Sequence, residues 1–319
     1  MRKHSLIVGG AGFIGTNLVK KLLSIGNLVT VIDDLSRGRK EFLDAYVDQK
    51  EFKFIEFDVS FSCDDAFNIA TKFCQIDEVW HLAANSDIPA GVLNPIVDLK
   101  NTFMTTFEVL RSMKKFNVKT IHFASSSAIY GDLGQVAITE NIGPLQPISN
   151  YGAMKLASEA QISAACESYL DRANIFRFPN VVGVPATHGV ILDFVFKLLK
   201  NNNELNVLGD GTQQKSYLHV SDLIDAMLLI IKHQVDKKMN VVNIGPIDEG
   251  VTVNWIANQV INKINPNALI IYGIGNKGWV GDVPKFIYST ELLQSFGWKP
   301  KLGSSEAVIK AIDEIILKS

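Results

Sequence analysis

Three glycines near the amino terminus constrain the fold of this chain more than any other feature. Gly9, Gly12 and Gly15 follow the apolar run at residues 5–8, and apolar residues recur after them at helical spacing. Glycines at such positions allow a tight turn and let the backbone approach a pyrophosphate at the amino terminus of a helix. The segment therefore predicts a strand, a phosphate-binding loop and a helix.

Apolar, strand-like runs recur through the first half of the chain, with helix-length segments between several of them. They lie at residues 5–8, 28–32, 52–56, 78–82 and 120–124, and helices are expected over 97–115 and 151–170. Alternating strands and helices form parallel sheets that helices cover on both sides. The sequence thus predicts an α/β fold with a doubly wound parallel sheet.

The pattern becomes less regular after Arg177, where prolines, an asparagine run at 201–203 and Gly209-Asp210-Gly211 separate shorter elements. This change predicts a smaller second lobe. The strand-like run at 241–244 indicates that the chain returns to the first lobe. We predict a dinucleotide-binding domain over 1–178 with a return segment over about 217–247, and an interleaved α/β substrate-binding lobe over 179–216 and 248–319.

An acidic residue, Asp33, follows the second predicted strand, about 20 residues after the glycine motif. A carboxylate there can accept hydrogen bonds from the ribose diol of an adenosine. Its charge would repel a ribose 2′-phosphate, which favours NAD over NADP. Arg37 and Arg39 lie close enough to reach such a phosphate, although a solvated basic loop is the simpler interpretation.

Two further motifs carry candidate catalytic chemistry. Tyr151 and Lys155 are four residues apart, so a helix places the phenol and the ammonium on one face. Positive charge from Lys155 or from an oxidised nicotinamide stabilises the phenolate of a tyrosine, whose ordinary pKa is about 10. Upstream, the serines at 125–127 follow an apolar strand, at the edge of the sheet where ligands bind in such folds.

Composition excludes several classes of function. Lys and Arg number 31 against 33 Asp and Glu, so no nucleic-acid-binding face is suggested. No run of about 18 apolar residues is present, so no membrane span is predicted. Cys63, Cys74 and Cys166 lack the spacing of a metal site or a disulfide framework, which favours a reducing, cytoplasmic compartment. His188 and His219 also lack ligand spacing, so no metal site is predicted.

Taken together, these motifs resemble those of the extended short-chain dehydrogenase/reductases, and most closely the UDP-glucose 4-epimerase branch of the nucleotide-sugar epimerase/dehydratases. The similar segments lie at 9–15, 57–59, 81–84, 124–131, 151–155, 177–180, 208–213, 217–222 and 278–284, across nearly the full chain. The resemblance implies a Rossmann domain that binds NAD, an isomerase activity, and a homodimer that pairs through the helices at 97–115 and 151–170.

The resemblance also assigns roles to residues. Tyr151 is the general base, Lys155 binds the nicotinamide ribose and tunes the tyrosine, and Ser126 hydrogen-bonds the reacting hydroxyl. The implied cofactor residues are Gly9, Gly12, Phe13, Ile14, Gly15, Asp33, Asp34, Leu35, Ser36, Gly38, Asp58, Val59, Leu82, Ala83, Ala84, Asn101, Ser125, Tyr151, Lys155 and Phe178. The implied sugar-nucleotide residues are Ser126, Asn180, Val190, Val207, Lys215, Tyr217 and Asp282.

The residues after the catalytic serine favour one reaction. In the family the base takes the C4 hydroxyl proton of the sugar while the C4 hydride moves to NAD. The 4,6-dehydratases then carry an Asp-Glu pair and the decarboxylases usually a carboxylate, where this chain has Ser127-Ala128. The resemblance therefore implies C4 epimerisation of a nucleotide-linked hexose, UDP-glucose or UDP-galactose, through a 4-keto sugar that rotates and takes the hydride back on its other face.

Two alternatives stay open: a 4-keto-sugar reductase or another nucleotide-sugar-modifying enzyme of this family, and a noncatalytic NAD-binding sensor. Lys215 and Trp279 stand where the well-known epimerases have arginines, so the grip on the substrate diphosphate must differ. Phe286 matches a position where a bulky side chain excludes 2-acetamido sugars, which predicts a preference for unacetylated hexoses.

Overall fold

The centre of the structure is a parallel sheet of seven strands. The computed structural model describes residues 2–134, 136–233, 236–278, 283, 285 and 287–318. The strands are β1 (His4–Val8), β2 (Leu28–Asp33), β3 (Phe52–Glu56), β4 (Glu78–His81), β5 (Thr120–Ala124), β7 (Arg172–Arg177) and β12 (Met239–Asn243). Their order is β12-β7-β5-β4-β1-β2-β3, so the sheet grows in opposite directions from β1. The predicted doubly wound, Rossmann-type α/β fold is confirmed.

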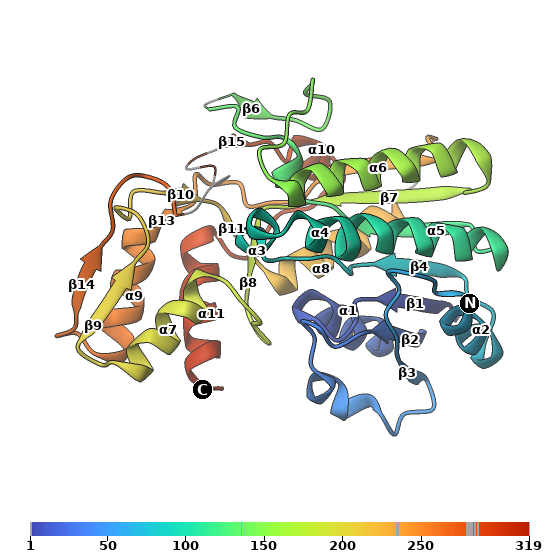
Figure 1. Ribbon diagram of the computed structural model, residues 1–319, viewed down its shortest axis with the longest axis horizontal. Coiled ribbons are helices and arrows are strands. Elements are labelled where there is room, and N and C mark those ends of the chain that lie inside the picture. Colours follow the sequence, from blue (N-terminus) through green and yellow to red (C-terminus); the bar gives the residue numbers. More distant parts are fainter. Residues whose placement is uncertain are drawn as a thin grey trace.

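Helices cover both faces of the sheet, and each face has its own apolar core (Figure 1). The main flanking helices are α1 (Phe13–Ser24), α2 (Asp64–Phe73), α5 (Thr105–Lys115), α6 (Asn150–Ser168) and α8 (Val220–Lys232). Leu22 of α1 and Met227 of α8 belong to one core, and Phe67 of α2 and Ile162 of α6 belong to the other. Alternate residues enter opposite cores along strands such as β1, β2 and β7, as burial on both faces requires.

The helical region expected over 97–115 is interrupted. It consists of α4 (Pro95–Asp98), a π-helical turn η2 (Leu99–Met104) and α5. The apolar spacing predicted one helix, because a periodicity read over many residues does not register one wide turn. Such turns are frequent at functional sites, and this one carries Asn101.

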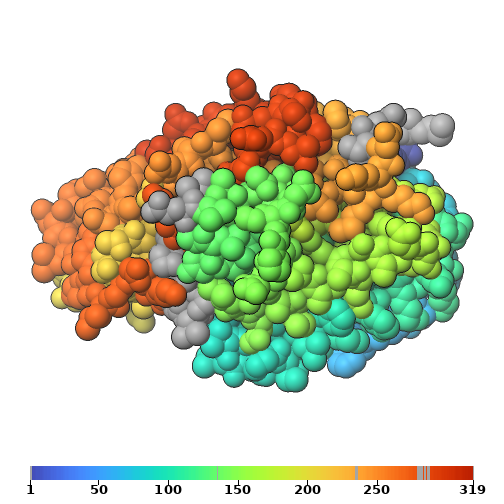
Figure 2. All heavy atoms as spheres, turned by 90° about the horizontal axis from the view of Figure 1, so that it is seen from above, coloured from blue at the N-terminus to red at the C-terminus, as the bar shows by residue number. Residues whose placement is uncertain are grey.

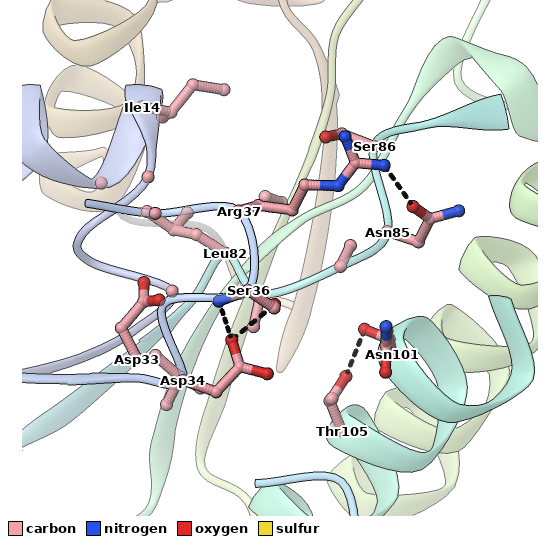
Figure 3. Close-up of a pocket in the computed structure, with 18 of the residues that line it drawn as sticks. Ile14, Asp33, Asp34, Ser36, Arg37, Leu82, Asn85, Ser86, Asn101 and Thr105 are labelled. Atoms are coloured by element: carbon pink, nitrogen blue, oxygen red, sulfur yellow. Dashed lines mark hydrogen bonds between the residues drawn. The ribbon is translucent and has the colours of Figure 1, made fainter. Parts of the chain in front are cut away.

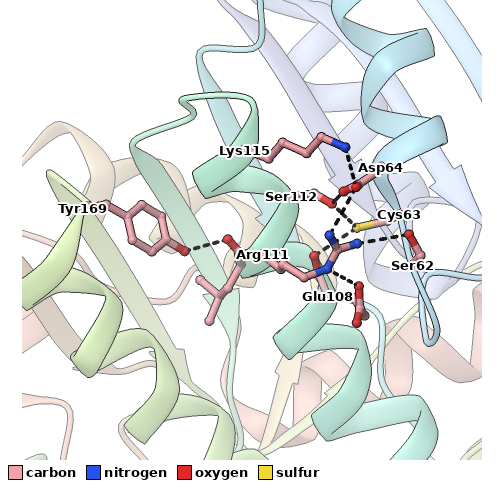
Figure 4. Close-up of polar contacts among 9 residues, drawn as sticks. Ser62, Cys63, Asp64, Glu108, Arg111, Ser112, Lys115 and Tyr169 are labelled. Atoms are coloured by element: carbon pink, nitrogen blue, oxygen red, sulfur yellow. Dashed lines mark hydrogen bonds and ion pairs between the residues drawn. The ribbon is translucent and has the colours of Figure 1, made fainter.

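Polar contacts fasten α2 to α5, and α6 to α5 (Figure 4). Asp64, in the first turn of α2, accepts hydrogen bonds from Lys115 Nζ at 2.7 Å and Arg111 Nη1 at 3.1 Å. The hydroxyl of Tyr169, just after α6, donates to the Leu110 carbonyl at 2.7 Å. These contacts fix the three helices that cover one face of the sheet.

A smaller lobe lies beside the sheet and is built from later parts of the chain (Figure 1). Its elements are α7 (Val190–Lys200), β9 (Glu204–Val207), β10 (Gln214–Lys215), β13 (Val251–Thr252), α9 (Val253–Ile264), β14 (Leu269–Tyr272) and α11 (Ser304–Ile316). Phe194, Leu205, Val260 and Ile312 meet in its core. Because α8 and β12 belong to the large sheet domain, the chain leaves this lobe and then re-enters it.

Two short strand pairs join distant parts of the chain. β8 (Asn180–Val182) pairs with β11 (Tyr217–His219), and β6 (Ala137–Ile138) pairs with β15 (Ile287–Tyr288). Figure 2 shows the green segment that holds β6 beside the red carboxy-terminal part of the chain. The remaining elements are η1 (Lys40–Tyr46), α3 (Ile88–Leu93), η3 (Ser127–Ile129) and α10 (Glu291–Ser295).

The described residues contain neither a membrane-spanning helix nor a group of metal ligands. None of the helices there has both the length and the apolar character that a membrane crossing requires. In the same part of the chain, no three histidine, cysteine, aspartate or glutamate side chains are grouped as a metal site needs.

Candidate active site

A pocket opens at the carboxyl edge of the sheet, where β1 lies between β2 and β4. This is the point at which ligands bind in doubly wound folds. Every residue that the sequence assigned to the cofactor lines this pocket except Leu35. The wall also contains residues that the sequence reasoning did not assign, among them Arg37, Asn85, Ser86, Thr105, Thr187 and His188.

The glycine loop lines the pocket and packs closely against the neighbouring backbone. Gly9 has φ +84, and a Cβ atom on it would stand 2.5 Å from the Ala83 nitrogen. Helix α1 begins directly after Gly12, and no side chain caps its amino terminus. Its first backbone N–H groups therefore remain for an anion such as the diphosphate of a dinucleotide.

Asp33 is fixed at the end of β2 by two backbone groups. Its carboxylate accepts hydrogen bonds from the N–H groups of Ala11 and Leu35, both at 2.9 Å. Burial raises the pKa of Asp33, and these two hydrogen bonds oppose that shift. The side chain lines the pocket at the position that suits an adenosine ribose, so the residues present fit NAD.

Leu35 differs from the sequence-based assignment. It has φ +59, and its side chain packs against the apolar core beneath β2 instead of the pocket. Its backbone N–H holds Asp33, so Leu35 acts on the site only through that contact.

The opposite end of the pocket brings the predicted catalytic residues together. Ser149 caps α6 by accepting from the Gly152 N–H at 3.1 Å, which starts the helix just before Tyr151. Lys155 lies one turn further on, with its Nζ 5.9 Å from the centre of the Tyr151 ring. Ser126, after β5, forms a side-chain hydrogen bond with Tyr151. Lys155 Nζ donates to the Ala124 carbonyl at 2.5 Å, which ties the helix to the strand.

Burial opposes both charged forms of the Tyr151 and Lys155 pair. It raises the pKa of Tyr151 to about 12, although the hydrogen bond from Ser126 acts in the other direction. It lowers the pKa of Lys155 to about 7, against the attraction of Glu159. The protein alone therefore holds a neutral phenol at neutral pH, and further positive charge is needed to stabilise the phenolate.

A buried ion pair supports the serine segment from behind. Arg177 Nη2 contacts Glu159 Oε2 at 2.6 Å, and its Nε contacts Oε1 at 3.0 Å. Ser125 also donates to Glu159. The sequence reasoning did not assign Glu159, although its position four residues after Lys155 places it on the same face of α6.

The described residues assigned to the sugar nucleotide do not line this pocket, although Ser126 is hydrogen-bonded to Tyr151 in its wall. Asn180 and Tyr217 face each other across the β8 and β11 pair, and Lys215 is in β10. Val207 and Tyr217 are 3% and 4% exposed, so their side chains belong to the core of the smaller lobe. Val190 is the first residue of α7. Three residues discussed from the sequence, Asp282, Trp279 and Phe286, lie outside the described residues.

The mouth of the pocket is crossed by a side chain. Arg37 Nη2 pairs with Asp87 Oδ2 at 2.8 Å. It also reaches Asn85 Oδ1 at 3.5 Å, a contact that Figure 3 shows. Arg37 and Arg39 are both exposed, which agrees with the interpretation of a solvated basic loop, and Arg37 is also paired with a carboxylate. Asp87 lies 50 residues away in the chain, so no local pattern could show this contact.

Comparison with known proteins places this geometry in a class. Residues 5–245 match the NAD dependent epimerase/dehydratase family, so the chain belongs to that family of extended short-chain dehydrogenase/reductases and uses NAD. Within the family, its relatives place it among the NAD-dependent isomerases.

Three relatives illustrate the similarity. The chain is 30% identical to the UDP-glucose 4-epimerase of Lactobacillus helveticus, over 95% of this chain and 94% of that one. A crystal structure of a UDP-galactose 4-epimerase superposes with a TM-score of 0.87 and 34% identity over 99% of both chains. UDP-glucuronic acid decarboxylase 1 of Xenopus tropicalis is 28% identical over 76% of this chain and 56% of its own length.

Proposed function

We propose that the protein is a nucleotide-sugar 4-epimerase that interconverts UDP-glucose and UDP-galactose with NAD bound throughout. The observation that carries this proposal is the placement of Tyr151 and Lys155 at one end of the NAD pocket, with Ser126 hydrogen-bonded to Tyr151. The names of the relatives support the choice of a UDP-hexose.

In the proposed reaction Tyr151 accepts the proton of the C4 hydroxyl and Ser126 orients that hydroxyl by a hydrogen bond. NAD held in the pocket would supply the acceptor, and later the donor, for the C4 hydride. Burial lowers the pKa of Lys155 to about 7. When it is protonated, Lys155 supplies positive charge next to the phenolate. After the 4-keto sugar rotates, Tyr151 returns the proton to the oxygen, so protons and hydride balance and C4 is inverted.

The segment after Ser126 supports epimerisation over elimination or decarboxylation. Ser127 and Ala128 are in the short turn η3, where the Ala128 N–H donates to Ser126 Oγ at 3.1 Å. The nearest carboxylate on α6, Glu159, is committed to Arg177. Among the described residues we find no further acid at the place that C5 or C6 chemistry requires.

The proposal is tested with purified protein, UDP-glucose, UDP-galactose, their 2-acetamido analogues and UDP-glucuronate, with products resolved by NMR. We expect interconversion of the two unacetylated hexoses without added NADH. Turnover that depends on NADH would indicate a 4-keto-sugar reductase, and a pentose formed from UDP-glucuronate would indicate a decarboxylase. Failure with every substrate, despite bound NAD, would favour a sensor. Faster conversion of UDP-N-acetylglucosamine would contradict the preference for unacetylated hexoses.

We also propose that two copies pair through the helices at 97–115 and 151–170, with the exposed apolar side chains of α3 and α4 beside them. Leu93 is 88% exposed, and Ile96, Leu99 and Phe107 are also exposed. Burial of such side chains between two copies would remove apolar surface from water. The free thiols of Cys63, Cys74 and Cys166 suit the proposed cytoplasmic location. The test of the dimer is given in the Discussion.

A further inference from the structure

The pair of Arg37 and Asp87 joins two loops that lie on opposite sides of the glycine loop. Arg37 follows β2 and Asp87 follows β4, and these strands flank β1 in the sheet. A contact between them at 2.8 Å therefore joins the two loops that lie on either side of the carboxyl end of β1. The Arg37 guanidinium also holds the pKa of Asp87 below its ordinary value.

The Asp87 end of this contact is anchored to buried structure. The second carboxylate oxygen of Asp87 caps α3 by accepting from the Ala90 N–H at 3.0 Å. Asn85 donates to the Asp87 carbonyl at 2.9 Å and to Asp98 Oδ1 at 2.8 Å. Because Asp98 is fully buried, Asp87 is part of a fixed network and not of a free loop.

The Arg37 end is anchored as well. The next residue, Gly38, lies so close to the glycine loop that a Cβ atom on it would stand 2.8 Å from the Ala11 carbonyl carbon. The Arg39 N–H donates to the Ala11 carbonyl at 3.1 Å. The backbone on both sides of Arg37 thus sits against the loop that the dinucleotide diphosphate approaches.

The distribution of charged side chains along the pocket makes Arg37 the group suited to contact the diphosphate. Asp33, Asp34 and Asp58 line the adenosine end, and Lys155 is engaged at the far end with Ala124. Arg37 is the guanidinium of this pocket wall. Both of its contacts with described residues use Nη2, which leaves Nε and Nη1 for the diphosphate.

We propose that Arg37 and Asp87 form a strap across the diphosphate of bound NAD, and that this strap slows release of the cofactor. The reason for such a strap rests on the proposed function: an epimerase restores NAD in every cycle, so exchange of the cofactor brings no benefit. In this strap Asp87 does not itself bind NAD. It holds Arg37 closed over the cofactor.

The test measures NAD release directly and uses no sugar substrate. Holoenzyme loaded with isotopically labelled NAD is chased with excess unlabelled NAD, and the label that stays with the protein is followed over time. We expect Asp87→Asn to speed release roughly threefold or more, as loss of a partly exposed ion pair predicts. Arg37→Gln, which also removes a diphosphate contact, should speed it roughly tenfold or more.

Coupling between the two side chains separates the strap from simpler roles. In the double variant Arg37→Gln, Asp87→Asn, release should match that of Arg37→Gln alone, because Asp87 acts through Arg37. Salt should speed release from the parent and have less effect on Asp87→Asn. Arg39→Gln, which removes a neighbouring arginine outside the pocket wall, is the matched control and should leave release unchanged.

Two outcomes would overturn the strap. If Asp87→Asn releases NAD at the parental rate or more slowly, while Arg37→Gln speeds release, Arg37 is only a direct diphosphate ligand. If neither variant changes release and both melt like the parent, the pair has no role in retention. Failure of the proposed function is seen separately, because it leaves sugars unconverted by a protein whose NAD exchange still depends on Arg37 and Asp87.

Discussion

The environment of Tyr151 and Lys155 shows how single residues set the chemistry of this site. Burial removes solvent from both groups and therefore disfavours both charged forms. The hydrogen bond from Ser126 only partly offsets this effect on the phenol. Ionisation of the phenol therefore requires positive charge beside it, which protonated Lys155 and a bound oxidised nicotinamide would supply.

Replacement of Tyr151, the proposed base, should separate catalysis from cofactor binding. Tyr151→Phe removes only the phenolic oxygen, so sugar conversion should fall by roughly 100- to 10,000-fold while the purified protein keeps its NAD. Initial rates and NAD content after gel filtration measure the two effects. Tyr169→Phe, in which the lost hydroxyl binds Leu110 away from the pocket, is the matched control. Loss of NAD together with activity would show that Tyr151 has another role.

The lowered pKa of Lys155 predicts a pH dependence of stability. In the folded protein without NAD this pKa is about 7, below its ordinary value of 10.5, so the unfolded chain binds more protons between these values. The free energy of unfolding should therefore rise with pH from 7 to 9, by roughly 1 kcal/mol per pH unit. Urea titrations at several pH values measure this slope, and Lys155→Met should remove it. A slope that persists in Lys155→Met would assign it to other groups.

Among the elements, the segment from β1 to α1 was predicted from local sequence and the π-helical turn was not. Gly15 marks a turn whose closest contacts are with Gly9 and Gly10, which are near it in the chain. The wide turn at η2 depends instead on how α4 and α5 meet α6, since η2 and α6 are in extensive contact. Local periodicity therefore located the helices but could not place Asn101 on the pocket wall.

Close packing within the glycine loop predicts a large difference between two alanine substitutions. A Cβ atom on Gly15 would clash with the Gly9 carbonyl oxygen and stand 2.6 Å from Gly10 Cα. Gly15→Ala should therefore lower the free energy of unfolding by about 2 kcal/mol. On Gly12 the nearest atom would be at an ordinary 3.6 Å, so Gly12→Ala should change stability little. Equal urea midpoints for the two variants would contradict the observed packing.

The ion pairs that Asp64 of α2 forms with α5 should make a modest, pH-dependent contribution to stability. Lys115 and Ser112 lower the pKa of Asp64 to about 2, from an ordinary value of 3.8. Its stabilising effect is therefore present above about pH 4 and is lost as the pH falls through 2. Asp64→Asn should cost about 1 kcal/mol at pH 7, and less in high salt, because the ion pairs are partly exposed.

Urea denaturation with and without salt measures the contribution of Asp64. Asp65→Asn, at the next and exposed position of α2, is the matched control and should be neutral. A cost of Asp64→Asn that salt does not reduce would point to the hydrogen bonds alone and not to the ion pairs.

For the whole molecule, the chain path explains why the site is complete only in the folded protein. The NAD pocket takes its wall from the ends of β1, β2, β4 and β5, and from Thr187 and His188 before α7. The smaller lobe thus contributes to the pocket although its own core is separate. This link suits a substrate that must reach both lobes.

The proposed dimer predicts that one exposed side chain controls the assembly. The parent should have twice the mass of one 35.2 kDa chain in light scattering at micromolar concentration. Phe107→Glu places a charge in the proposed interface and should produce monomers. Phe196→Glu, at an exposed position of α7 in the smaller lobe, should leave the mass unchanged. A monomeric parent, or a dimer unaffected by Phe107→Glu, would exclude this interface.

By itself the sequence determined the features that depend on neighbours along the chain: the strand, glycine loop and helix at the amino terminus, Asp33 at the end of β2, and the shared helix face of Tyr151 and Lys155. Backbone geometry and helical periodicity are local, so these followed from residue type and spacing. The tertiary structure decided which way Leu35 faces, how far burial shifts the pKa values of the catalytic pair, and that Arg37 meets Asp87. Those outcomes depend on strand order and on contacts between residues far apart in the chain, which no local pattern encodes.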